Sequence, residues 1–187
     1  MIDLKPACDT MIDLLLGTSA DQLDRPTPCS EYTVALLIDH IGGVAQRFTA
    51  FARKDTGDIP REIAAHPKVV AERVRTLGLA WDDPSAWQGT TALSADLEQS
   101  NELWGRIALT EMVVHAWDLA QATDRPFTLS TPTLHACLDH VVAFIPNAPI
   151  PELWSSAVET SDDAALIDRI VAVTGRNPRW AEVADRG

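Results

Sequence analysis

The segment LWGRIALTEMVVHAWDLAQA, residues 103–122, decides the fold expected for this chain, because it is long and almost entirely apolar. It carries Glu111 and His115, four residues apart, so a helix would place their side chains on one face, one turn from each other. A carboxylate and an imidazole set in an apolar wall need a partner, because an unpaired buried charge is costly. A divalent metal ion is the simplest candidate for that partner.

A count around this helix separates two sides. If the angular position of Glu111 around the helix axis is set to zero, His115 lies at roughly 40° and Asp118 at roughly −20°. Both share a stripe of the helix surface with apolar residues. The ordinary polar side chains fall at roughly 220–280° and predict a separate, solvated side, made of Arg106, Thr110 and Gln121. Glu111 and His115 are therefore expected to look inward.

Further helices are predicted wherever apolar residues recur at three and four positions between capping residues. The expected segments are residues 6–16, 34–52, 61–77, 131–144 and 162–174. Residues 23–30 and 80–91 are interpreted as a connector and an irregular extended segment, and strand signals are almost absent. The fold class expected is therefore all-α, a helical bundle with long connections and an extra C-terminal helix.

Length and composition limit the domain organisation, the binding partners and the cellular location that can be expected for the protein. The 187 residues, 46% of them hydrophobic, predict a single domain over residues 1–187, in which residues 146–187 form a C-terminal extension packed on the bundle. A net charge of −12 argues against a nucleic-acid partner, which needs clustered basic residues. The sequence shows neither a long apolar run nor a secretory signal, so no membrane span is expected and the predicted location is cytoplasmic.

The three cysteines, Cys8, Cys29 and Cys137, are widely spaced and form neither a disulfide framework nor a metal knuckle. Cys29 precedes an expected helix start, where a thiolate would be favoured. The alternative interpretation is a small, half-buried thiol, and the role of Cys29 is left open.

The third metal ligand is expected from a different helix, because bundles build metal sites from side chains on facing helices. His40 is the best candidate, since it lies at the edge of the apolar stripe of the 34–52 helix, roughly 100° from its centre. Gly42 and Gly43 follow it, and each costs about 1 kcal/mol relative to alanine inside a helix, so they are expected to permit a close approach. The remaining histidines are weaker candidates: His66, His135 and His140.

Two histidines and one carboxylate leave coordination positions open, which for zinc is the pattern of a catalytic site. A thiolate would suit an open position, and zinc would lower the pKa of that thiol. Asp118 could orient a ligand. Two alternatives without a metal stay open at this point, namely a hydrogen-bonded Glu111–His115 pair in the core and a structural role for His40.

Three segments resemble the motifs of the mycothiol-dependent maleylpyruvate isomerase-like proteins, which belong to the DinB/YfiT-like superfamily. The first segment spans residues 26–43, beginning with PTPC (26–29) and ending with DHIGG (39–43). The second is EMVVHAWDLA (111–120), and the third is GRNPRW (175–180). The resemblance implies a DinB-like four-helix bundle and a divalent metal, usually zinc, with nickel or another divalent ion as alternatives. Matched by motif, the implied ligands are His40, Glu111 and His115. The resemblance also implies a low-molecular-weight thiol such as mycothiol as partner.

The leading hypothesis is a metal-dependent thiol transferase or isomerase-type enzyme that acts on a small electrophile. Asp118 and Trp117 would support the ligands, and no catalytic residue is assigned. The rival hypothesis is a non-catalytic metal-binding or stress-associated protein that binds a ligand. A homodimer is compatible with the resemblance, and nothing in the residue spacing decides for or against it.

Overall fold

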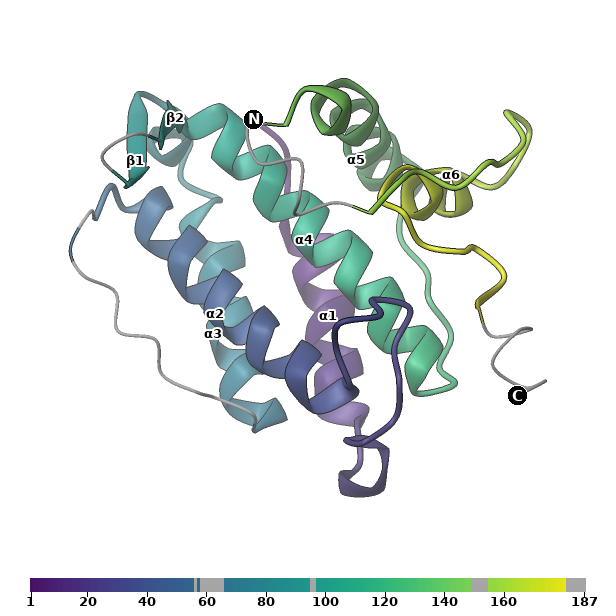
Figure 1. Ribbon diagram of the computed structural model, residues 1–187. Coiled ribbons are helices and arrows are strands. Elements are labelled where there is room, and N and C mark those ends of the chain that lie inside the picture. The colour runs from purple at the N-terminus through teal and green to yellow at the C-terminus, as the bar shows by residue number, and fades with distance from the viewer. Residues whose placement is uncertain (56, 58–65, 95–96, 149–154, 181–187) are drawn as a thin grey trace.

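The computed structural model describes residues 1–55, 57, 66–94, 97–148 and 155–180 (Figure 1). Its helices and strands, in chain order, are α1 (Lys5–Gly17), α2 (Val34–Ala52), α3 (Pro67–Ala80), β1 (Thr90–Ser94), β2 (Leu97–Ser100), α4 (Asn101–Ala122), α5 (Thr131–Phe144) and α6 (Leu166–Val173). Short 3-10 turns occupy Ala20–Gln22, Pro84–Trp87 and Ile145–Asn147. Within the described ranges, no helix is long and apolar enough to cross a membrane.

Helix α4 lies in the middle of the molecule, with α2 on one side and α5 and α6 on the other (Figure 1). It contacts α1, α2 and α5, while α3 contacts both α1 and α2. The prediction that Thr110 lies on a solvated side of α4 is wrong, because this residue is only 2% exposed. Helix α5 covers it, and Sγ of Cys137 lies 3.8 Å from its hydroxyl. A helix that is apolar nearly all round is buried nearly all round.

The helix ends follow local capping. Thr33, Ser100 and Ser130 each accept a hydrogen bond from the backbone amide three residues on, and they begin α2, α4 and α5. The predicted helices 34–52 and 131–144 have the same bounds as α2 and α5. The last helix is shorter than predicted, since α6 begins at Leu166 rather than at residue 162. The prediction for 61–77 corresponds to α3, and residues 61–65 of it lie outside the described residues.

The all-α prediction is wrong because β1 and β2, residues 90–94 and 97–100, pair in an antiparallel two-stranded sheet. Thr91 in β1 is buried, and its backbone oxygen accepts a hydrogen bond from Trp104 Nε1 at 2.8 Å. Its hydroxyl donates to Oδ1 of Asn101, whose side-chain amide in turn donates to the carbonyls of Phe51 and Ala86. Contacts with distant parts of the chain thus anchor these short strands. The fold is mostly helical with a small two-stranded sheet.

Candidate metal centre

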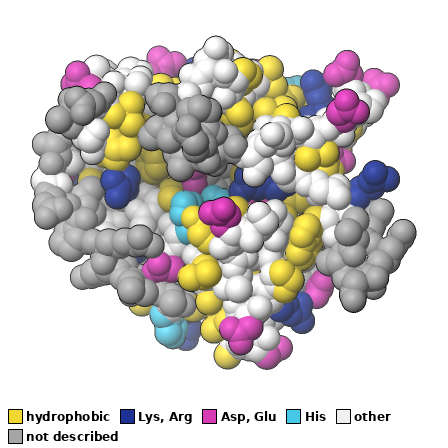
Figure 2. Space-filling model, in the orientation of Figure 1, with side chains coloured by type: hydrophobic (Ala, Val, Ile, Leu, Met, Phe, Trp, Pro, Cys, Tyr) yellow, Lys and Arg dark blue, Asp and Glu magenta, His cyan; other side chains and the backbone are white. Residues whose placement is uncertain are grey.

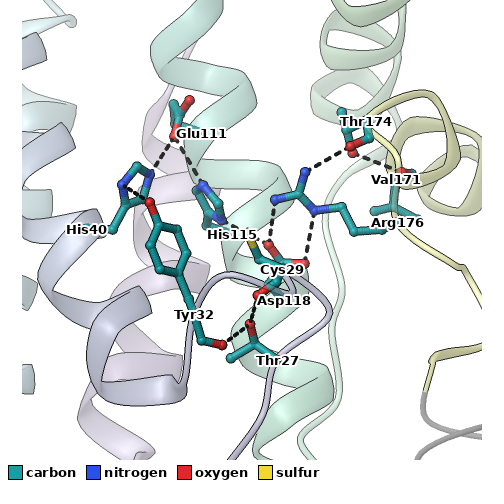
Figure 3. Close-up of polar contacts among 10 residues, drawn as sticks. All are labelled: Thr27, Cys29, Tyr32, His40, Glu111, His115, Asp118, Val171, Thr174 and Arg176. Carbon is teal, nitrogen blue, oxygen red and sulfur yellow. Dashed lines mark hydrogen bonds and ion pairs between the residues drawn. The ribbon is translucent and has the colours of Figure 1, made fainter. Parts of the chain in front are cut away.

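Helices α2 and α4 bring His40, Glu111 and His115 together (Figure 3). One potential ligand atom from each of the three lies within 4.8 Å of the other two. Nε2 of His40 and Nε2 of His115 each lie 3.3 Å from Oε2 of Glu111. The structure therefore assembles in one place the three residues singled out from the sequence, although 71 residues separate His40 from Glu111 along the chain.

The other ring nitrogen of each histidine is also engaged. Nδ1 of His115 donates to Oδ2 of Asp118 at 2.9 Å, and Nδ1 of His40 lies 3.3 Å from the hydroxyl of Tyr32. The Tyr32 and His40 rings are stacked with their centroids 5.0 Å apart. These partners fix the orientation of both rings, so that both Nε2 atoms face Glu111.

Two of the three separations between the potential ligand atoms match those expected around a metal ion. A tetrahedral zinc with bonds of about 2.0–2.1 Å to nitrogen and oxygen places its ligand atoms about 3.3 Å apart. The two Nε2–Oε2 separations have this value, 3.3 Å. Two imidazoles and one carboxylate also form a donor set that zinc accepts in catalytic sites with an open position.

Burial and mutual contact determine the charges of Glu111 and His115. Burial favours the neutral form of Glu111, but the hydrogen bonds with His115 and His40 outweigh it and hold the pKa of this carboxyl below its usual range. Burial likewise disfavours the charged form of His115, yet its bonds to Asp118 and Glu111 raise its pKa to about 9. At neutral pH and without a metal, His115 is therefore an imidazolium held between two carboxylates.

A buried ion pair lies behind His115. Asp118 is fully buried and accepts hydrogen bonds from Arg176, at 3.0 Å from Nη2 to Oδ2 and at 3.3 Å from Nε to Oδ1. Arg176 follows α6 and also donates from Nη1 to the carbonyl of Thr174. Asp118 thus contacts His115 on one side and Arg176 on the other, and the contact with Arg176 emerged only from the tertiary structure.

The loop before α2 positions Tyr32. The hydroxyl of Thr27, which is buried, lies 2.9 Å from the carbonyl oxygens of both Cys29 and Tyr32. Sequence reasoning did not single out Tyr32, although its distance of eight residues from His40 offered a signal. An aromatic hydroxyl close in sequence to a candidate ligand is able to fold back on it.

A pocket of about 290 Å³ opens above the three groups. Its walls are residues 28–32 of the loop, the side chains of His40, Glu111 and His115, and the C-terminal residues Ser155 and 174–176. Figure 2 views this side of the molecule and shows histidine, acidic and basic side chains gathered near the middle of the face. Glu111 and His115 therefore point into a polar pocket rather than into the apolar core.

Three further expectations from the sequence concern Cys29, Trp117 and Gly43. Burial raises the pKa of the half-buried Cys29 thiol, against the opposing charge of Arg176, which favours the half-buried thiol over the thiolate, the two interpretations left open for Cys29. Trp117 is buried but does not line the pocket. A Cβ on Gly43 would meet no atom within 4 Å, so the close approach expected at this glycine is wrong.

The other three histidines lie outside the pocket lining. His135 is exposed on α5 and His140 is buried on it, stacked on Phe144, so the two occupy different faces as expected. His66 is the N-cap residue of α3. No second group of potential metal ligands occurs in the part of the chain that the structure describes.

Comparisons with known proteins find a matching family model and related sequences. Residues 4–120 match the family model described as mycothiol maleylpyruvate isomerase N-terminal domain. Two proteins of Mycobacterium tuberculosis, from two strains and both described as uncharacterized, are 33% identical to this chain over 121 residues. That alignment covers 63% of this chain and 63% of each relative. No solved structure gives a significant match.

The family match includes the three residues that converge in the pocket from α2 and α4, namely His40, Glu111 and His115, and also the buried Asp118 behind them. It ends before Ser155 and Arg176, which form the opposite wall. The chain belongs to the mycothiol maleylpyruvate isomerase N-terminal domain family.

Proposed function

We propose that this protein binds a divalent metal ion through Nε2 of His40, a carboxylate oxygen of Glu111 and Nε2 of His115, and that it uses the site to activate a low-molecular-weight thiol. The convergence of these three atoms within 4.8 Å at the floor of a pocket carries the proposal. Zinc is the metal that the two imidazoles and the carboxylate favour. We also propose that the fold is a DinB-like four-helix bundle and that the protein is located in the cytoplasm.

The pocket supports thiol chemistry in particular. A divalent ion held there would lower the pKa of a bound thiol and keep it as a nucleophile. Three protein ligands leave at least one position for that sulfur. Mycothiol is the thiol proposed, because the family description names it. The rest of the 290 Å³ pocket would hold a small electrophile next to the thiol.

This chain's own residues would position the reactants. Asp118 and Tyr32 hold the two imidazoles, so the ligand geometry exists before the metal arrives. The loop residues 28–32 and the C-terminal residues 174–176 enclose the pocket from two sides and limit access of water to the bound thiol. The reaction proposed is addition of the thiolate sulfur to an electrophilic carbon of a double bond, after which the adduct takes up the proton that the thiol had lost. Isomerisation would follow if the same thiolate then left again after rotation about the former double bond.

Two measurements test the proposal. Elemental analysis of protein purified without an affinity tag or chelator should find about one divalent ion per chain. The metal-loaded protein should then consume mycothiol with at least one electrophile from a panel that includes maleylpyruvate. His115→Ala should lose both metal and turnover, because it removes a ligand. His135→Ala, on the exposed face of α5, is the matched control and should retain both.

The outcomes separate the rival functions. Bound metal without turnover on any electrophile would favour the non-catalytic metal-binding protein. Protein that contains no metal and binds none on addition would contradict both functions and leave the three groups as a hydrogen-bonded cluster. Turnover unaffected by His115→Ala would contradict the proposed site.

A further inference from the structure

The contact between Arg176 and Asp118 joins the C-terminal segment to the metal centre. Both oxygens of the Asp118 carboxylate accept from Arg176, and Oδ2 also accepts from Nδ1 of His115. The Asp118 side chain is 0% exposed and that of Arg176 is 11% exposed. Two hydrogen bonds to the fork of a guanidinium fix the plane of a carboxylate, which a single point contact does not do.

The end of α6 aims Arg176 at this position. The backbone amide of Arg176 donates to the carbonyl of Val171 at 2.9 Å, and that of Gly175 donates to Ala172 at 3.0 Å. These two bonds form the glycine-terminated helix end known as the Schellman motif, with Gly175 at a φ of +84°. A Cβ on Gly175 would lie 2.5 Å from Cβ of Ser155, so both the backbone conformation and the close packing require glycine here.

The position of α6 is itself fixed by packing. Ile170, Val171 and Ala172 are fully buried, and α6 contacts α5, which contacts α4. The guanidinium is thus carried on a rigid support rather than on a free tail. It reaches a residue 58 positions earlier in the chain, on the helix that carries Glu111 and His115.

We propose that Arg176 is a positioning residue of the metal centre, which acts through Asp118 on the orientation of His115. This inference rests on the proposed function, because it concerns how the metal ligands are held. Arg176 lies beyond residues 4–120, which match the family model, so the C-terminal segment completes a site whose ligands all come from the family domain.

The physical reason lies in the buried charge of Asp118. Without Arg176, this carboxylate would remain in an apolar interior with only His115 as a partner. The carboxylate would then be free to rotate, and rotation weakens its hold on Nδ1 of His115. Such outer-shell partners usually contribute about 10–100-fold to metal affinity.

Chelator competition with zinc, measured on the full-length chain, tests the proposal. Arg176→Met should weaken zinc affinity about 10–100-fold and change the visible absorption bands of bound Co²⁺, which report ligand geometry. Arg176→Lys keeps the charge but not the two-pronged contact and should fall between the wild type and Arg176→Met. Arg25→Met is the matched control, because Arg25 pairs with Asp124 at the exposed surface outside the pocket, and it should leave zinc affinity unchanged.

A double-mutant comparison separates action through Asp118 from a direct contact with the bound ligand. If Arg176 acts through Asp118, then Asp118→Asn alone and Asp118→Asn with Arg176→Met should bind zinc equally, within about threefold. If the double variant instead loses zinc affinity by the product of the two single-variant factors, the proposal is overturned, because Arg176 would then act independently of Asp118. Unchanged zinc affinity and an unchanged Co²⁺ spectrum in Arg176→Met would also overturn it and leave Arg176 a purely structural residue.

Failure of the proposed function would look different from failure of this inference. Wild-type protein that binds neither zinc nor Co²⁺ contradicts the metal site itself, whatever the variants do. Thermal unfolding of the metal-free proteins shows whether each variant is folded. If Arg176→Met does not fold, the comparison of Arg176→Lys with wild type decides, and wild-type zinc affinity together with a wild-type Co²⁺ spectrum in Arg176→Lys would overturn the proposal.

Discussion

Nδ1 of His115 donates a hydrogen bond to the buried carboxylate of Asp118 at 2.9 Å, and this bond turns Nε2 of the same ring toward Glu111. One imidazole therefore bridges two carboxylates on the same helix, three residues away on one side and four on the other. The charge and the orientation of this ring would govern metal binding at the proposed site.

Metal affinity should rise with pH between 7.5 and 8.5. Contacts with Asp118 and Glu111 raise the pKa of His115 to about 9, so the metal-free ring is protonated in this range. A metal must displace that proton, so the dissociation constant of the metal should fall about tenfold for each unit by which the pH rises. Binding should release about one proton. Zinc titrations in buffers of different ionisation enthalpy measure this number. An affinity independent of pH over this range would contradict the prediction.

The metal-free protein should lose stability as pH rises from 6.5 toward 9. The folded-state pKa of His115 lies above its unfolded value, so its contribution is full below about 6.5 and is lost as pH approaches 9. The loss should be roughly 2–3 kcal/mol in the free energy of unfolding. Urea unfolding in the presence of a chelator measures it. His115→Gln should flatten this part of the pH profile, and a profile equally steep in the variant would assign the effect to another group.

Tyr32→Phe should weaken zinc binding less than Asp118→Asn does. The variant keeps the ring stacked on His40 but loses the hydroxyl 3.3 Å from Nδ1. A neutral hydrogen bond of this length orients the ring less firmly than a buried carboxylate, so an increase of about 3–10-fold in the dissociation constant is expected. The chelator competition described above ranks the two variants. A larger loss in Tyr32→Phe than in Asp118→Asn would reverse the assigned importance of the two partners.

Iodoacetamide should modify Cys29 before the other two cysteines of the folded protein. Burial raises the pKa of both Cys8 and Cys137 to about 12, whereas Cys29 is half-buried and lines the pocket. Its own pKa is also raised, so labelling should accelerate as pH increases. Mass spectrometry of the intact and digested protein identifies the site. Unfolded protein, in which all three cysteines react, provides the control.

Gly105→Ala should destabilise the protein, whereas Gly43→Ala should stabilise it. A Cβ at Gly105 would lie 2.6 Å from Cζ3 of Trp87 and 2.8 Å from Cζ3 of Trp81, and both rings are buried. Overpacking of this kind costs about 1–3 kcal/mol. A Cβ at Gly43 meets nothing within 4 Å, so alanine should add about 0.5–1 kcal/mol through helix propensity. Urea unfolding compares the two variants, and a stabilised Gly105→Ala would show that the Trp rings can move apart.

The helices were predictable because their signals are local. The apolar repeat of residues 34–52 and the cap at Thr33 lie within one segment, so the sequence predicts α2 with its observed bounds. Glu111 and His115 were also found locally, since a spacing of four residues places two side chains on one helix face whatever the tertiary structure is. His40 needed the further assumption that a facing helix supplies the third ligand.

Only the tertiary structure decided the features that depend on distant partners. The pairing of β1 with β2 depends on Asn101, which bonds Thr91 and also reaches the carbonyl of Phe51, 50 positions earlier in the chain. The strand residues carry little strand pattern of their own. Thr110 is buried because α5 covers it, and Arg176 reaches Asp118 because α6 packs on α5 and ends in a glycine turn. The local sequence thus determined the helices and the Glu111–His115 pair, while packing between helices decided which groups surround that pair, because a periodic pattern specifies a face of a helix but not the residue opposite it.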